Sequence, residues 1–126
     1  GTVDEIEELG IVGATFLSMK RALGGLSAAF DLVLLDGNRP IPNYTKEQKT
    51  IVKGDSSCFA IAGASILAKQ ERDSYMIEMG KNFPDYGFES HVGYGTKKHM
   101  ESLKDFGACS LHRKNFAPVQ QCMNSI

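Results

Sequence analysis

The apolar positions along the chain follow the period of an amphipathic helix in some stretches and form short runs typical of buried strands in others. Between residues 6 and 23 the large apolar side chains lie on or near one face of a helix. This helix begins at a capping box, in which the Thr2 hydroxyl and the Glu5 carboxylate bond first-turn amides, and it ends at the glycines at 24 and 25. Within it, the glycines at 10 and 13 would cost helix stability unless another backbone packs closely against them.

Two short strands and two further helices are predicted after this helix. The predicted elements are strands at about residues 30–36 and 49–53, an amphipathic helix at about 58–81, an ordered loop at 83–95 and a helix at about 96–106. A loop with two prolines separates the strands, Thr96 caps the last helix, and Gly107 stops it. Strands that alternate with helices in this way indicate the α/β class.

Composition and length limit the classes of protein to consider. The 126 residues are 42% hydrophobic and 23% charged, which is typical of one folded domain, or part of a larger one, and argues against disorder. No apolar stretch reaches the roughly 18–20 residues that span a bilayer, and the acidic amino end does not resemble a signal peptide. The three cysteines form no C-x-x-C pair and predict idle thiols in a reducing cytosol, so we expect a cytoplasmic location without membrane contact.

Charge is distributed unevenly along the chain. Residues 1–36 carry six acidic and two basic side chains, a net charge of −4, whereas residues 91–115 carry five basic and two acidic ones, a net charge of +3. The basic region is suited to a polyanion such as nucleic acid, and it is equally consistent with an ordinary solvated face.

Two aspartates follow the two predicted strands. Asp36 ends the first apolar run, before a glycine, and Asp55 follows the second run in Lys53-Gly54-Asp55. Reactive groups in α/β proteins collect at the carboxyl ends of neighbouring strands, so adjacent strands would bring these carboxylates together around a divalent cation. In the alternative interpretation, Asp36 simply forms a turn and Asp55 caps the next helix.

Three further side chains suit a nucleic-acid substrate. Tyr94 lies between Gly93 and Gly95, which let the backbone approach a ligand and leave the phenol to stack on a sugar or base, or to bind a ribose 2′-OH. Lys69 and Arg72 project from the same side of the long helix, where they can clamp a phosphate or form a solvated face. His91, His99 and His112 show no metal-ligand spacing, and we expect structural or hydrogen-bonding roles for most of them.

Four longer motifs follow one another along the chain. They are Val52-Lys53-Gly54-Asp55-Ser56, then Ile61-Ala62-Gly63-Ala64-Ser65-Ile66-Leu67-Ala68-Lys69 with Arg72-Asp73, then Tyr86-Gly87-Phe88-Glu89-Ser90-His91-Val92-Gly93-Tyr94-Gly95-Thr96, and His112-Arg113-Lys114-Asn115-Phe116-Ala117-Pro118. In order and spacing they resemble ribonuclease HII of the bacterial type, from about Ile6 to Val119.

This resemblance implies an RNase H-like fold and a metal-dependent endonuclease, a phosphodiester hydrolase of DNA replication and repair. It implies cleavage of the RNA strand of RNA–DNA hybrids, and of duplex DNA 5′ of a single embedded ribonucleotide, at four carboxylates that bind two Mg²⁺ or Mn²⁺ ions. Asp36 and Asp55 correspond to two of those carboxylates, and Tyr94 to the tyrosine that contacts the ribonucleotide at the RNA–DNA junction. Lys69 and Arg72 match positions near the substrate backbone, and Asp73 is expected to pair with Lys69 within the helix.

The sequence departs from the family in one large respect. It has neither the Asp-Glu pair nor the Gly-Arg-Gly loop of the family's first strand, which supply the other two carboxylates and part of the ribonucleotide grip. We therefore expect residues 1–126 to be the carboxyl-terminal portion of a single catalytic domain, with an open sheet edge, an uncovered apolar face and little activity alone. Its partner would be the absent amino-terminal segment. The alternatives are a non-catalytic nucleic-acid-binding fragment and a scaffold without a substrate.

Overall fold

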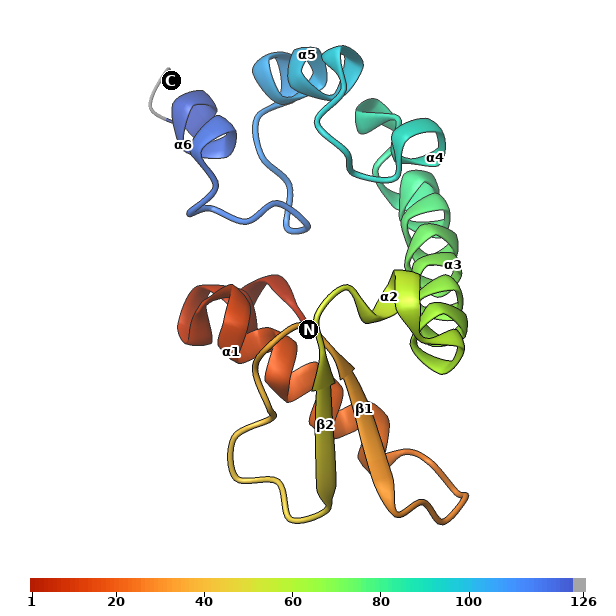
Figure 1. The fold of residues 1–126 in the computed structure, drawn as a ribbon. Helices are drawn as coiled ribbons and strands as arrows, with labels where there is room; N and C mark the ends of the chain where they lie inside the picture. Colours follow the sequence, from red (N-terminus) through yellow and green to blue (C-terminus); the bar gives the residue numbers. More distant parts are fainter. Residues whose placement is uncertain (124–126) are drawn as a thin grey trace. The chain divides into compact units, whose positions relative to one another are not determined.

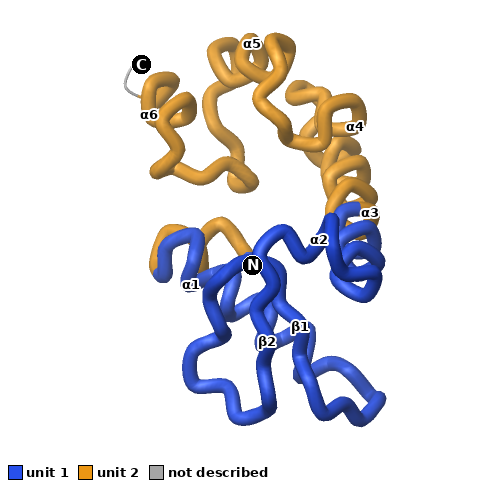
Figure 2. Tube along the Cα trace, in the orientation of Figure 1, with its two compact units in different colours: residues 1, 9–69 blue, residues 2–8, 70–126 orange. Residues whose placement is uncertain are grey.

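The computed structural model describes residues 1–123, which form two compact units. One unit contains Gly1 and Leu9–Lys69, and the other contains Thr2–Glu8 and the chain from Gln70 onward (Figure 2). The elements in chain order are α1 (Val3–Gly24), β1 (Leu32–Asp36), β2 (Glu47–Ile51), α2 (Gly54–Ser57), α3 (Phe59–Asn82), the 3-10 helix η1 (Pro84–Tyr86), α4 (Phe88–His91), α5 (Lys97–Phe106) and α6 (Ala117–Met123) (Figure 1). This mixture of helices and strands confirms the predicted α/β class. No helix within residues 1–123 has the length and hydropathy needed to cross a membrane.

The first unit is built on a parallel pair of strands. β1 and β2 pair in a register that runs from Leu32 beside Glu47 to Asp36 beside Ile51. The loop of residues 37–46 carries the chain back, and the side chain of Gln48 holds it by accepting from the Ile41 amide at 2.8 Å and donating to the Ile41 carbonyl at 3.2 Å. These two hydrogen bonds hold the ten-residue loop against the start of β2, and so they help this short loop to connect two parallel strands.

One face of the sheet packs on α1. Val33 and Leu35 of β1 and Ile41 of the return loop are each at most 6% exposed. They form a small core against partly buried apolar side chains of α1, the strand flanks and the return loop, which are Phe16, Met19, Leu23, Phe30 and Tyr44. Because side chains alternate across a strand, the other face of β1 turns away from this core, and Leu32 is 44% exposed.

The first predicted helix is confirmed at its start and differs in its interior. The capping box forms, with the Thr2 amide donating to Glu5 at 2.8 Å and the Glu5 amide donating to Thr2 at 3.2 Å. Gly10, however, has φ 70° and ψ 166°, so it kinks α1, and nothing lies within 4 Å of the Cβ that a larger residue would place there. Gly10 therefore permits the kink, and within residues 1–123 no other backbone packs closely against it.

The second unit encloses an aromatic core. Tyr86, Phe88, Leu103 and Val119 are buried together, with the Tyr86 and Phe88 rings stacked at 5.4 Å. The predicted loop at 83–95 contains η1 and α4, and α6 lies in a tail for which no helix was expected. The cap of α5 is confirmed, because the Thr96 hydroxyl accepts from the His99 amide at 3.3 Å.

The strand predicted at 49–53 occupies 47–51 instead. Lys53 takes a left-handed conformation with φ 55°, which an extended strand excludes, and it starts the turn into α2. β2 begins two residues earlier than predicted, at Glu47, which pairs with Leu32 of β1.

We predict that replacing Leu103 by Ala lowers the free energy of unfolding by about 2–5 kcal/mol, because it leaves a cavity at a site that is 1% exposed. Lys104→Ala, on the solvent side of the same helix, is the matched control and should cost less than about 0.5 kcal/mol. Urea unfolding measures both. Equal losses in the two variants would contradict the buried position of Leu103.

Candidate functional site

The two predicted acidic residues lie at the carboxyl end of the parallel strands. Asp36 is the last residue of β1, and Asp55 lies in α2, just beyond β2. The Oδ1 atom of Asp36 accepts a hydrogen bond from the backbone N–H of Gly54 at 2.8 Å. Because Gly54 immediately precedes Asp55, this bond links the Asp36 side chain directly to the backbone that carries Asp55. The structure thus brings together the two positions that the sequence pairs.

The backbone around Gly54 explains the residue types of this motif. Lys53 precedes it in the left-handed conformation, which lets the chain turn sharply from β2 into α2. A Cβ at position 54 would lie 2.6 Å from Cδ1 of Ile61 and 3.4 Å from Oδ1 of Asp36. A side chain at position 54 would push Cδ1 of the buried Ile61 aside and would contact the Asp36 carboxylate.

The carboxylates of Asp36 and Asp55 suit a hard divalent cation that also binds ligands from outside this pair. Asp36 and Asp55 are both exposed, and carboxylate oxygens are the ligands that Mg²⁺ and Mn²⁺ prefer. Asp55 also accepts from the Ser56 hydroxyl at 3.3 Å. Within residues 1–123 no group of three or more His, Cys, Asp or Glu side chains could hold a metal. The pair therefore fits a cation that takes its remaining ligands from water, from substrate phosphate or from another segment.

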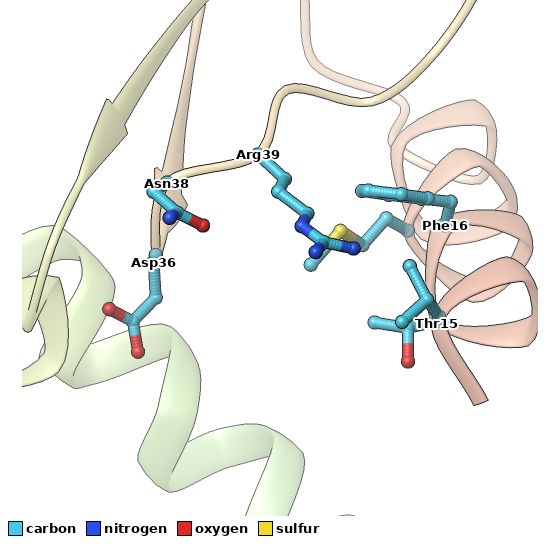
Figure 3. Close-up of a pocket in the computed structure, with 8 residues that line it drawn as sticks. Thr15, Phe16, Asp36, Asn38 and Arg39 are labelled. Carbon is cyan, nitrogen blue, oxygen red and sulfur yellow. The ribbon is translucent and has the colours of Figure 1, made fainter.

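A hollow of about 200 Å³ adjoins Asp36. Figure 3 shows Asp36 and Asn38 on one side and Arg39 extending across towards Thr15 and Phe16 of α1. Arg39 places a permanent positive charge beside the acidic site. The sequence interpretation missed it, although its position three residues after Asp36 was an available signal.

Tyr94 and Arg72 meet in the second unit. The guanidinium of Arg72 lies over the Tyr94 ring, 5.0 Å from its centroid, and the tyrosine is 55% exposed. Gly93 makes this approach feasible, because a Cβ there would lie 3.1 Å from Cε of Met76 and 3.5 Å from Nη2 of Arg72. One ring face is therefore backed by a cation while the residue stays open to solvent.

The long helix α3 carries both predicted cations. Lys69 precedes Arg72 by three residues, as the sequence indicates, and lies in the first unit, whereas Arg72 lies in the second. The Nη1 atom of Arg72 pairs with Asp73 at 3.2 Å. The expected pairing of Asp73 with Lys69 stays a prediction.

The three histidines are buried, and all of them are hydrogen-bonded within the second unit. Nε2 of His91 bonds the Tyr86 carbonyl at 2.7 Å, Nδ1 of His99 bonds the Tyr94 carbonyl at 2.9 Å, and the Nε2 atoms of His99 and His112 are 3.0 Å apart. The predicted hydrogen-bonding roles are confirmed, but sequence spacing gave no sign that His99 and His112 touch. Burial lowers the pKa of both of these imidazoles from their usual value.

Two of the non-glycine residues with positive φ adjoin predicted site residues. Lys53 precedes Gly54-Asp55, and Val92, with φ 44°, precedes Gly93-Tyr94. For a β-branched residue such as Val92 this conformation costs about 1–3 kcal/mol, so the surrounding contacts must hold it in place.

Comparison with known proteins identifies relatives over nearly the whole chain. A family model described as Ribonuclease HII matches residues 2–119. The chain is 50% identical over 119 residues to a ribonuclease HII of Endomicrobium trichonymphae, covering 94% of this chain and 57% of that protein. It is 46% identical over 125 residues to a ribonuclease HII of Burkholderia lata, covering 99% of this chain and 58% of that protein. The chain thus spans well under two thirds of the length of these curated relatives.

We predict that Asp36→Ala lowers the free energy of unfolding by about 0.5–1.5 kcal/mol, because it removes the acceptor for the Gly54 amide. Asp36→Asn keeps a carbonyl oxygen at that position and should lose less. Urea unfolding of the two variants, compared with the parent chain, provides the measurement. Identical losses would show that the bond to Gly54 contributes nothing to stability.

We predict that stability falls as the pH drops below about 6.5. The pKa values of His99 and His112 are lowered in the folded chain, so below the usual histidine pKa near 6.5 the unfolded chain binds more protons. The contribution of these neutral imidazoles is complete above that pH and is lost as the pH falls towards their folded-state pKa. Urea midpoints between pH 7.5 and 5.5 test this, with a variant lacking both histidines expected to show a flatter profile. Parallel profiles would refute it.

Proposed function

This chain belongs to the ribonuclease HII family, and on that basis we propose that it is the carboxyl-terminal portion of one metal-dependent endoribonuclease domain. The proposed enzyme hydrolyses the RNA strand of RNA–DNA hybrids and cuts duplex DNA 5′ of single embedded ribonucleotides, in cytoplasmic DNA replication and repair. The observation that carries the proposal is the hydrogen bond from the Gly54 amide to the Asp36 carboxylate, which joins Asp36 to the backbone next to Asp55. Family membership supplies the reaction class.

In this proposal Asp36 and Asp55 are catalytic residues that hold Mg²⁺ or Mn²⁺. Two such ions, when bound, would acidify the attacking water and stabilise the leaving oxygen. The Gly54 amide orients the Asp36 carboxylate through Oδ1, which leaves Oδ2 available as a ligand. Two carboxylates are too few to fix two ions, so the other pair would come from a family-type amino-terminal segment.

The substrate would be recognised by the second unit and by α3. We propose that the exposed phenol of Tyr94 contacts the ribonucleotide at the RNA–DNA junction. Arg72 backs the Tyr94 ring and, with Lys69, adds positive charge next to the phosphate backbone. Arg39 contributes a further cation beside Asp36.

An apolar groove of about 660 Å³ in the first unit fits the proposed amino-terminal segment. It is lined mainly by apolar side chains of α1, β1 and the first half of α3. Leu32 of β1, which lines this groove, is 44% exposed. A segment that pairs with the open sheet edge would cover this face, and without it we expect the isolated chain to be inactive.

A non-catalytic nucleic-acid-binding fragment is the second candidate. It is favoured by one observation, namely that the contact of Arg72 with Tyr94 needs no metal, while residues 1–123 contain no complete metal cluster. The two candidates differ in whether Asp36 matters.

We predict that the 126-residue chain cleaves a DNA duplex with one ribonucleotide only when a family-type amino-terminal segment is supplied in trans with Mg²⁺ or Mn²⁺. Asp36→Asn should abolish that cleavage, since it removes a ligand charge while keeping the acceptor for Gly54. Asp31→Asn, just before the same strand, is the matched control and should leave cleavage unchanged.

Each outcome of this cleavage assay decides between the candidates. Cleavage by the chain alone would show that its own ligands suffice. Duplex binding that Asp36→Asn leaves unchanged, with no cleavage in any mixture, would favour the binding fragment.

A further inference from the structure

We infer that the buried chain of hydrogen bonds from His112 through His99 to the Tyr94 carbonyl positions Tyr94 for recognition of the ribonucleotide. The two histidines are positioning residues, since they act through Tyr94 and not on the substrate. This inference rests on the proposed role of Tyr94 and adds the hydrogen bonds that hold Tyr94 in position.

The proton positions in this chain follow from its two ends. The Cys109 amide can only donate, and it donates to Nδ1 of His112 at 3.0 Å, so the ring proton of His112 is on Nε2. That proton points at Nε2 of His99, 3.0 Å away. His99 therefore carries its own proton on Nδ1, which donates to the Tyr94 carbonyl at 2.9 Å. Both rings must be neutral for the chain to be complete.

His91 fixes the backbone on the other side of Tyr94. Its Nδ1 accepts from the Gly93 amide at 3.2 Å, and its carbonyl accepts from the Tyr94 amide at 2.8 Å. Its ring also stacks on His99, with centroids 4.5 Å apart and planes at 14°. The Tyr94 carbonyl accepts a second bond from the Thr96 amide at 2.8 Å. The amide and the carbonyl of Tyr94 are thus both hydrogen-bonded.

The strained turn before Tyr94 explains why these hydrogen bonds are needed. Val92 and Gly93 both have positive φ, at 44° and 83°, and they place Tyr94 at the end of the turn. A turn of this kind relaxes unless other contacts oppose it. The exposed phenol therefore stands on a rigid base, which reduces the conformational entropy lost when a ligand is bound.

The surroundings of these imidazoles are largely apolar. Phe88 lies against the rings of His99 and His112, with centroids 5.6 and 5.8 Å apart, and both histidines are less than 9% exposed. What imidazoles add to such a core is a directional chain of hydrogen bonds, with a donor at one end and an acceptor at the other. Here the acceptor end is Nδ1 of His112, and the donor end is Nδ1 of His99, which bonds the Tyr94 carbonyl.

The test uses a matched pair of substitutions at position 99 in the 126-residue chain. His99→Leu keeps the volume and removes the donor, whereas His99→Asn can place an amide N–H where Nδ1 was. The readout is the ratio of dissociation constants for an all-DNA duplex and for the same duplex with one ribonucleotide, with Tyr94→Phe as the benchmark. A merely structural role would change both affinities together and leave the ratio unchanged.

We expect His99→Leu to lower this ratio about as much as Tyr94→Phe does, roughly 2–10-fold, and His99→Asn to restore at least half of the loss. Long-range ¹H–¹⁵N spectra of the parent chain should show the ring proton on Nδ1 of His99 and on Nε2 of His112. His112→Leu, which leaves His99 in place, provides a second variant should His99→Leu not fold, and it should lower the ratio in the same direction.

The outcomes separate this inference from the proposed function. A parent chain that discriminates, together with folded His99→Leu and His112→Leu variants that discriminate equally well, would overturn the inference alone. Reversed ring protons on His99 would do the same. A parent chain with no discrimination would overturn the proposed role of Tyr94, and the inference with it.

Discussion

The hydrogen bond between the Asp36 carboxylate and the Gly54 amide is the interaction on which the acidic site depends. It exists because β1 and β2 are parallel, so that the residues after both strands emerge at the same edge of the sheet. The return loop makes this direction achievable, and the Gln48 side chain closes that loop on Ile41. This bond between the Asp36 side chain and the Gly54 backbone thus rests on the topology of the first unit.

The second unit solves a different problem, the burial of polar rings. Imidazoles in an apolar core are costly unless each nitrogen finds a partner, and all six nitrogens of the three histidines do so here. Four of those partners are backbone groups: one in η1, two between α4 and α5, and one after α5. The buried histidines therefore order the loops around them. A substitution that changes the packing of this core would also change the conformation of those loops.

Local signals predicted much of the fold and of the site. The Thr2–Glu5 box, the Thr96 cap and the bounds of α3 depend on neighbouring residues, and all were predicted closely. Asp36 and Asp55 were identified because the position of a residue at or just after the end of a strand is set by that strand. The pairing of their positions was expected from parallel strands, and the structure shows it.

Features that depend on distant contacts were missed. The contact of His99 with His112 joins residues 13 apart, and α6 packs on a core that no local period reveals. The shift of β2 depends on its pairing with β1, which begins at Leu32 beside Glu47. The kink at Gly10 depends on a backbone angle that glycine permits without requiring. Arg39 was missed although it follows Asp36 by three residues; the fold adds that both residues line one hollow with side chains of α1.

The closeness of Gly54 to both Ile61 and Asp36 affects how substitutions at position 54 should be interpreted. Any side chain at position 54 would have to displace the Cδ1 methyl group of Ile61, and it would touch the Asp36 carboxylate. In a saturation screen scored by activity, this glycine would rank with the acidic residues, although it has no side chain with which to touch a substrate. Intolerance at that position would thus report a steric boundary of the site and not a chemical role.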